Sequence, residues 1–304
     1  MSGQSWVGRG LARPGLPRFI KEVCIMIGAI AGDVIGSRWE FTPLKRREFD
    51  LFSSQNEFTD DSVLTLCVGE ALMRSWSKDR FETLSEETKN TMLDVGYWYP
   101  SCGFGGRFYK WMYQSRPQPY NSCGNGSAMR VSAVGDIARS LEEAADLSHK
   151  VTEITHNHPE GIKGAEATAV AIYLARHGYA KDEIREYVER YYYPSIKSVE
   201  EYHKETQGHG RELCQISVPQ AFAAFFEGED YESVIRNCVY IGGDSDTTGA
   251  IAGGIAEGFY GVPEDIKEMA LRYLDRRFKN IWYRWEMWSK RFIQSGGKES
   301  CLTE

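Results

Sequence analysis

Apolar side chains recur every three to four positions along most of this chain, which is the spacing of one buried helix face. Leu147, Val151 and Ile154 follow this spacing in one such stretch. The apolar runs and the start signals before them predict helices over 62–74, 141–154, 164–177, 181–191, 218–226, 231–240 and 249–259. Runs that alternate with period two, which mark strands, are scarce. The pattern predicts an all-α protein.

The segment 263–292 continues the helical pattern with many charges between its apolar positions. Those positions are Ile266, Met269, Ala270, Leu274, Phe278, Ile281, Trp282 and Trp285. This spacing predicts one long amphipathic helix or a pair of helices packed on the domain, with the aromatic residues in the core rather than around a cofactor. The chain shows no internal repeat of the length that helical solenoids use. We therefore expect a single domain over 23–292.

The two ends lack this pattern. Residues 1–22 mix Gly, Pro, Arg and Ser without periodicity, and we expect a disordered N-terminal tail there. Residues 293–304 are expected to form a C-terminal tail. The apolar run 23–31 is far shorter than the roughly 20 residues that a membrane span needs. No membrane association is therefore expected.

The net charge and the cysteines indicate which partners and which cellular compartment to expect. The formal net charge of −7 and the pI near 5.6 leave no broad basic surface, so non-specific nucleic acid binding is not expected. The seven cysteines are odd in number and none lies in a C-x-x-C pair, which argues against a disulfide framework and a zinc knuckle. These features favour a cytoplasmic protein, and we expect it to be a monomer.

Two short acidic segments, 58–62 and 242–248, stand apart chemically. Each places two aspartates and several hydroxyls just before an apolar helical run: Asp60 and Asp61 in the first, Asp244 and Asp246 in the second. Helix capping would explain one or two of these acids. Unpaired carboxylates beside a core are unfavourable, so a compensating positive charge is needed. Four carboxylates would formally neutralise two divalent cations, which take oxygen ligands.

A calcium loop is the competing metal site. Asp244, Asp246 and Gly249 occupy positions 1, 3 and 6 of the EF-hand pattern. The pattern then fails, because position 5 is Thr248 and position 12, which should be a bidentate Glu, is Ile255. Binding of divalent cations in another geometry is the favoured interpretation, and capping remains the alternative.

Two loops rich in small residues, 102–106 and 122–130, are bordered by aromatic residues. Backbone N–H groups in such loops can hold a phosphate, and nearby aromatics can hold a base or a ribose. Tight turns between helices are an equally good interpretation. Neither loop matches a P-loop or a full dinucleotide-binding glycine motif.

His156 and His158 lie two residues apart, but no third His or Cys is near in sequence, so zinc is disfavoured. A hydrogen-bonding role for His156 in a polar pocket, or plain loop structure, is the better interpretation. Gly28, Gly32 and Gly36 have the four-residue spacing that permits close contact between helices.

Taken together, these motifs resemble the ADP-ribosylglycohydrolase family, typified by dinitrogenase reductase-activating glycohydrolases. The resemblance runs from Ile27 to about Gly261. It is carried, in this order, by 28–37 with Glu40, 58–62, 103–106, 121–130, 155–161 and 242–247. Each motif is short, and the ordered set is specific.

The resemblance implies a single compact orthogonal all-α domain with two Mg²⁺ or Mn²⁺ ions at the base of a cleft. The metal ligands that it implies are Thr59, Asp60, Asp61, Asp244, Asp246 and Thr247. Glu40, which by itself reads as a surface acid, matches the acidic residue of a flap and is expected to act in catalysis with Asp60 and Asp61. The implied substrate contacts are Gly103, Phe104, Gly105, Gly106, Ser122, Cys123, Gly124, Asn125, Gly126, Met129 and His156.

The activity that the resemblance implies is removal of ADP-ribose from a modified target by metal-assisted hydrolysis of the glycosidic bond. The expected partners are ADP-ribose and an ADP-ribosylated protein, with arginine as the favoured acceptor. A non-catalytic ADP-ribose-binding member, a hydrolase of O-acetyl-ADP-ribose or another conjugate, and a hydrolase of the pyrophosphate remain alternatives. The intact acids Glu40, Asp60, Asp61, Asp244 and Asp246 argue against the non-catalytic one.

Overall fold

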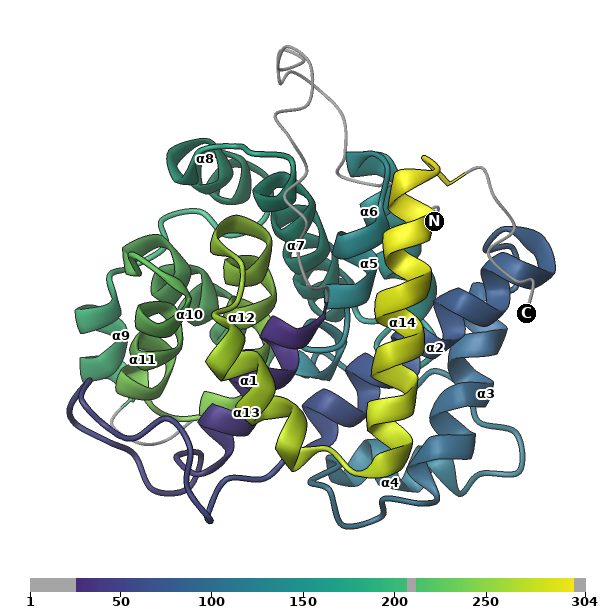
Figure 1. Ribbon diagram of the computed structural model, residues 1–304, viewed down its shortest axis with the longest axis horizontal. Helices are drawn as coiled ribbons and strands as arrows, with labels where there is room; N and C mark the ends of the chain where they lie inside the picture. The colour runs from purple at the N-terminus through teal and green to yellow at the C-terminus, as the bar shows by residue number, and fades with distance from the viewer. Residues whose placement is uncertain (1–25, 207–211, 298–304) are drawn as a thin grey trace.

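Helices form the described part of the chain, residues 26–206 and 212–297 of a computed structural model, and no strand occurs in that part (Figure 1). The helices are α1 (Ile27–Ser37), α2 (Asp60–Asp79), α3 (Leu84–Gly96), α4 (Gly106–Met112), α5 (Ser132–Ile137), α6 (Leu141–Thr152), α7 (Pro159–Arg176), α8 (Lys181–Tyr191), α9 (Val199–Thr206), α10 (Cys214–Glu227), α11 (Tyr231–Ile241), α12 (Ser245–Tyr260), α13 (Glu264–Tyr273) and α14 (Arg276–Gln294), with one 3₁₀ turn, η1 (Asn125–Ser127). The all-α prediction is confirmed.

The helices with strong apolar periodicity form where the sequence predicts them, and α8 has the predicted bounds. Other helices begin earlier than the sequence predicts: α7 begins at Pro159 rather than at 164, and α12 at Ser245 rather than at 249. At α7 the start is fixed by His158, whose side chain accepts from the Glu160 amide, and by the proline that follows it. The short helices α4, α5 and α9 carry too few apolar positions for the pattern to reveal them.

The segment 263–292 forms a pair of helices, α13 and α14. Asp275 separates them, because its carboxylate accepts from the Phe278 amide and caps α14. The aromatic face of α14 is buried against α2, where the rings of Trp76 and Phe292 lie 4.9 Å apart. The expected core role of these aromatic residues is therefore confirmed.

Most residues of the two expected tails lie outside the part of the chain that the structure describes. Residues 1–22 lie outside the described residues, and so do 298–304. Helix α14 continues to Gln294, within the segment expected as a C-terminal tail.

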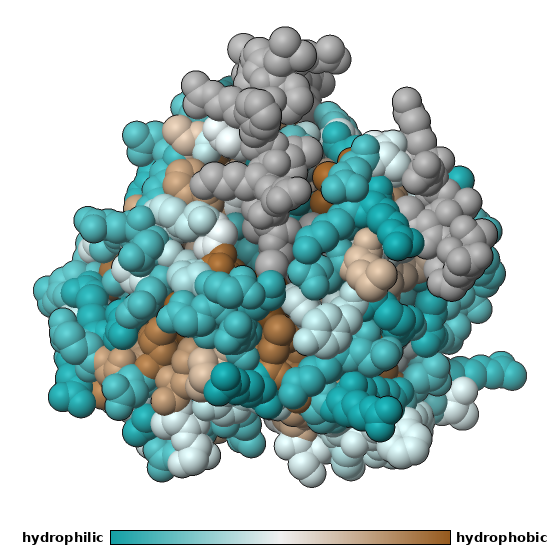
Figure 2. Space-filling model, viewed as in Figure 1, coloured by the Kyte–Doolittle hydropathy of each residue, from teal (hydrophilic) through white to brown (hydrophobic). Residues whose placement is uncertain are grey.

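The face in Figure 2 is covered mainly by hydrophilic side chains. None of the described helices is long and apolar enough to cross a bilayer.

Helices α1 and α12 cross the middle of the molecule side by side and touch through their backbones (Figure 1). A Cβ added to Gly32 would lie 2.0 Å from the Gly249 carbonyl oxygen, and one added to Gly28 would lie 2.5 Å from that of Gly253. At the other end of the contact, the Ser245 hydroxyl donates to the Gly36 carbonyl at 2.9 Å. Because no side chain separates the helices, residues on α1 come within hydrogen-bonding range of the start of α12.

We expect Gly32→Ala to lower the free energy of unfolding by about 3 kcal/mol, because the added methyl group has no space unless the two helices separate. Urea unfolding followed by circular dichroism measures this change. Gly106→Ala is the control, since a Cβ at that helical glycine meets no atom within 4 Å. Equal stability of the two variants would contradict the close helix contact.

Candidate active site

A cavity of about 490 Å³ opens where the starts of α2 and α12 meet the two glycine-rich loops. Most residues that the sequence singled out line it: Glu40, Thr59, Asp60, Asp61, Gly103, Gly105, Gly106, Ser122, Cys123, Gly124, Asn125, Gly126, Met129, His156, Asp244, Asp246 and Thr247. Phe104 is the exception, since it packs on Phe108 with ring centroids 5.0 Å apart and does not line the cavity. The structure thus brings together segments that lie far apart in the sequence.

The start of α2 is held by a residue from α1. Asp33 accepts hydrogen bonds from the Thr59 and Ser62 amides, both at 3.0 Å, and from the Thr59 hydroxyl at 2.7 Å. The Ser62 hydroxyl also donates to this carboxylate. Thr59 itself caps α2 by accepting from the Asp61 amide. The carboxylates of Asp60 and Asp61 are therefore not used for capping.

The start of α12 supplies the other two aspartates. Asp244 stands at the N-cap position, but its side chain makes no capping hydrogen bond. The side-chain amide of Asn125 donates to Asp244 Oδ2 at 2.5 Å and to the Ser217 hydroxyl at 2.8 Å. The Thr247 hydroxyl lies 3.2 Å from Asp61 Oδ2 and links the two helix starts. The Thr247 backbone amide donates to Asp246 Oδ1 at 2.9 Å, so satisfying the helix start accounts for part of the role of Asp246 but not for Asp244.

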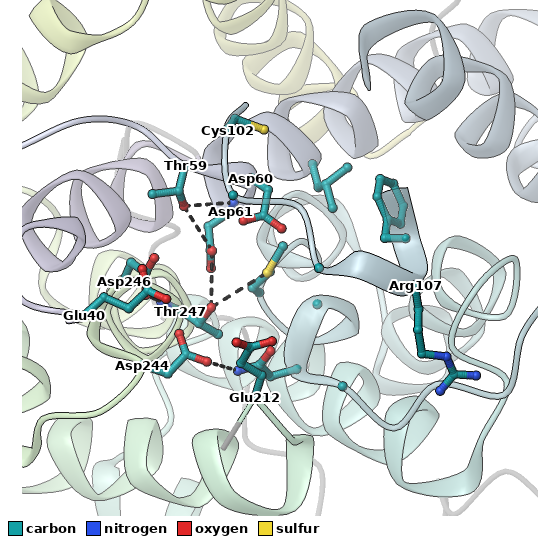
Figure 3. A pocket seen from close by; sticks show the side chains of 18 of the residues that line it. Glu40, Thr59, Asp60, Asp61, Cys102, Arg107, Glu212, Asp244, Asp246 and Thr247 are labelled. Carbon is teal, nitrogen blue, oxygen red and sulfur yellow. Dashed lines mark hydrogen bonds between the residues drawn. The ribbon is translucent and has the colours of Figure 1, made fainter. Parts of the chain in front are cut away.

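The carboxylates face one another across a small space (Figure 3). Ligand oxygens of Asp33, Asp61 and Asp246 lie within 4.8 Å of one another, and so do those of Glu40, Asp244 and Asp246. In the described part of the chain, no lysine or arginine forms an ion pair with these acids or with Asp60. Like charges are thus held together without a basic partner.

The pKa values of these acids reflect that crowding. Burial, and then the charges of neighbouring acids, raise the pKa of Asp60, Asp61 and Asp246 well above the usual aspartate value. Burial, followed by the charge of Asp244, raises the pKa of Glu40 to about 7. For Asp33 burial raises the pKa to about 6, against hydrogen bonds from Ser62 and Thr59 that lower it. All five acids would be easier to ionise beside a positive charge.

The residues present fit divalent cations. They offer several carboxylate oxygens and two hydroxyl oxygens, the hard ligands that Mg²⁺ and Mn²⁺ take. Asp61 Oδ1 is buried and has no hydrogen-bond partner, which leaves an oxygen available for a ligand. No histidine or cysteine belongs to either carboxylate group, so the donor set does not favour zinc.

Some residues at the site were missed from the sequence. Asp33 is the one charged residue of α1, and that isolated charge among small apolar residues was the available signal. Arg107, Tyr120 and Glu212 also line the cavity, but none of them belongs to a motif that the sequence singles out. Arg107 donates to the Tyr120 carbonyl and lies across the cavity from the acids (Figure 3).

Two backbone amides of the loop 122–130 donate hydrogen bonds within the protein. The backbone amide of Gly124 donates to the Ser122 hydroxyl at 3.1 Å, and the backbone amide of Asn125 donates to the Glu212 carbonyl at 3.2 Å. These two donors are therefore engaged within the protein. Of the described residues that line the cavity, Arg107 is the one lysine or arginine, and it is better placed to meet an anionic group.

A model of the ADP-ribosylglycohydrolase family matches residues 23–285. The chain belongs to the ADP-ribosylglycohydrolase family. The match passes beyond Gly261, where the recognised motifs end, and takes in α13 and much of α14.

Several members of the ADP-ribosylglycohydrolase family are similar in sequence. ADP-ribosyl-[dinitrogen reductase] glycohydrolase of Rhodospirillum rubrum is 28% identical over 73% of this chain and 74% of its own length. ADP-ribosylarginine hydrolase Tri1 of Pseudomonas putida is 24% identical over 81% and 73%. ADP-ribosylhydrolase ARH3 of Bos taurus is 25% identical over 88% and 92%.

A solved structure of an ADP-ribosylglycohydrolase-related protein complex shows the same fold. It superposes with a TM-score of 0.66 and covers 88% of this chain and 97% of its own. Its sequence identity to this chain is 23%, so the likeness concerns the fold alone.

We expect Mg²⁺ to raise the melting temperature relative to EDTA, because a bound cation relieves the repulsion among the buried acids. The gain corresponds to about 2.7 kcal/mol when the cation is present at a hundred times its Kd. Asp246→Asn removes one of the crowded charges, so this variant should melt above the wild type in EDTA and gain less from Mg²⁺. Differential scanning calorimetry measures both effects.

Asp94→Asn serves as the control for this experiment, because Asp94 is an exposed acid on α3 away from the cavity. It should respond to Mg²⁺ as the wild type does. A wild type whose melting temperature is the same in EDTA and in Mg²⁺ would contradict a cation site.

Proposed function

We propose that this protein hydrolyses the glycosidic bond of ADP-ribosylated arginine and releases ADP-ribose, with two divalent cations bound by its acidic cluster. The observation that carries the proposal is the meeting of four aspartates from two helix starts in one cavity, without a basic partner, in a member of this family. A cavity of about 490 Å³ lies within the size range of sites for small molecules.

Each helix start contributes one set of ligands. Thr59, Asp60 and Asp61 would hold the cations from α2, and Asp244, Asp246 and Thr247 from α12. When bound, Mg²⁺ or Mn²⁺ would act as a Lewis acid toward ligand oxygens and lower the pKa of water. The hydroxyls of Thr59 and Thr247 both lie 3.2 Å from Asp61 Oδ2, so this carboxylate joins the two sets.

Glu40 is placed to handle a proton. It is partly exposed at the cavity, whereas Asp244 and Asp246 beside it are buried, so its carboxylate can meet water and substrate. Hydrolysis requires that the attacking water lose a proton as its oxygen bonds to the anomeric carbon. Glu40 would accept that proton and pass it to the arginine nitrogen as the bond between this nitrogen and the anomeric carbon breaks.

The opposite wall would bind the ADP-ribose. Arg107 offers a guanidinium that suits the pyrophosphate, and it is held over the Tyr120 ring at 4.8 Å. Gly103 has φ +103°, and a Cβ there would lie 3.1 Å from Asp60 Oδ1. The loop 103–106 therefore touches the acids at Gly103, and Gly105 and Gly106 continue the wall of the same cavity.

Arginine is the acceptor that the charges favour. Glu57 and Glu212 line the cavity in addition to the acidic cluster, and a guanidinium would be attracted to such a rim. Among the similar proteins, one is named an ADP-ribosylarginine hydrolase. Serine linkages and acetyl esters carry no positive charge and would gain less from these acids.

We expect free ADP-ribose and unmodified arginine from ADP-ribosylarginine in Mg²⁺, with slower release from serine-linked and acetyl-linked ADP-ribose. Asp60→Asn should lower kcat/KM at least about a hundredfold. Glu40→Gln should lower kcat by about 10²–10⁴-fold with a smaller change in KM. Chromatography of the products, beside circular dichroism of each variant, measures these effects.

Asp94→Asn is again the control, because Asp94 is an exposed acid on α3 away from the cavity. Its turnover should stay close to that of the wild type. Release of AMP and ribose phosphate would overturn the proposal in favour of pyrophosphate hydrolysis. Tight binding of ADP-ribose without turnover of any conjugate would overturn it in favour of a binding protein.

A further inference from the structure

His156 lies between α6 and α7 with its two ring nitrogens in different surroundings. The residue is 5% exposed and lines the cavity. A Cβ added to Gly124 or Gly126 would lie 3.5 or 3.4 Å from Nε2, so the glycines of this loop leave that nitrogen uncovered. Nδ1 instead lies 2.7 Å from the Thr155 hydroxyl. One nitrogen thus belongs to the cavity wall and the other to the protein interior.

Arg130 stands behind this pair and has no acidic partner. It is fully buried, and its Nη2 donates to the Val151 carbonyl at 2.8 Å and to the Thr155 hydroxyl at 2.9 Å. No carboxylate in the described part of the chain forms an ion pair with it. A buried guanidinium without a counterion is unfavourable and calls for a specific purpose.

The directions of the hydrogen bonds that link Arg130, Thr155 and His156 follow from which groups can donate. A guanidinium only donates, so the Thr155 oxygen is the acceptor in its bond to Arg130. The Thr155 hydroxyl proton is then directed to His156 Nδ1, its other close neighbour. If Nδ1 carried a proton instead, Thr155 would accept twice and its own buried proton would lack an acceptor. The chain of bonds therefore runs from Arg130 through Thr155 to Nδ1.

The state of the ring agrees with this order. Burial, and then the charges of Arg130 and Arg107, lower the pKa of His156 well below the usual histidine value. The imidazole is therefore neutral and carries one proton. With Nδ1 accepting from Thr155, that proton is on Nε2, the nitrogen at the cavity.

We propose that Arg130 and Thr155 are positioning residues that fix His156 as its Nε2–H tautomer, so that it donates a hydrogen bond to a ligand oxygen in the cavity. The acceptor would be a phosphate or ribose oxygen, and only its assignment to ADP-ribose rests on the proposed function. Arg130 and Thr155 act through the ring and do not line the cavity themselves.

Thr155→Val tests the relay, because it keeps the shape of the side chain and removes the hydroxyl. Thr152→Val is a matched control one turn earlier, since the buried Thr152 hydroxyl has no hydrogen-bond partner. Thr155→Ser restores the hydroxyl and should restore the wild-type behaviour. Substitution of Arg130 itself is avoided, since loss of this large buried side chain would disturb the fold.

The first readout is the ¹⁵N spectrum of the full-length protein labelled at histidine, without ligand, with the His156 signals assigned by His156→Gln. In the wild type, Thr155→Ser and Thr152→Val, Nε2 should carry the proton and Nδ1 should show the shift of an accepted hydrogen bond. In Thr155→Val, Nδ1 should move to the position of an unbonded ring nitrogen. A wild type that carries its proton on Nδ1 would overturn the proposal.

The second readout is the Kd for ADP-ribose by calorimetry. Thr155→Val should bind about tenfold more weakly, whereas Thr155→Ser and Thr152→Val should stay within about twofold of the wild type. Unchanged affinity in Thr155→Val would overturn the proposal. The spectrum needs neither ligand nor turnover, so the relay is tested even if the protein fails to hydrolyse any conjugate.

Discussion

The backbone contact between α1 and α12 is the constraint on which the site depends. Glycines on both helices let their chains touch, so a carboxylate on α1 and the first turn of α12 come within a few ångströms. Asp33 then reaches across to hold the start of α2, and Thr247 links α12 to Asp61. A side chain at Gly32 would force the helices apart and separate these groups.

The same contact imposes an electrostatic penalty. Among the acids in or beside the cavity, burial and mutual repulsion raise the pKa of Asp33, Glu40, Asp60, Asp61 and Asp246 and so oppose their ionisation. Hydrogen bonds to Asp33 and from Asn125 offset part of this penalty. The unpartnered Oδ1 of Asp61 is a position that these bonds leave unfilled. Divalent cations would supply the missing positive charge.

Much of this could be predicted from the sequence because it rests on local patterns. Apolar periodicity predicted the long helices, and the paired aspartates before apolar runs predicted the acidic cluster. The bond from Asn125 to Asp244 could not be predicted, because the two residues meet only through folding. The resemblance implies Asn125 as a substrate contact, and in the structure its side-chain amide also positions the carboxylate of Asp244. The positions of Arg107 and of the partners of His156 could not be predicted either, because these contacts also form only through folding.

The most direct test of the acidic cluster as a cation site is a titration of the purified, EDTA-treated protein with Mn²⁺, followed by electron paramagnetic resonance. We expect two bound Mn²⁺ per chain, close enough for their spins to couple, and loss of the coupled signal in a variant with Asp61→Asn and Asp246→Asn. Free Mn²⁺ that rises from the first addition, with no bound ion in the wild type, would contradict a cation site there.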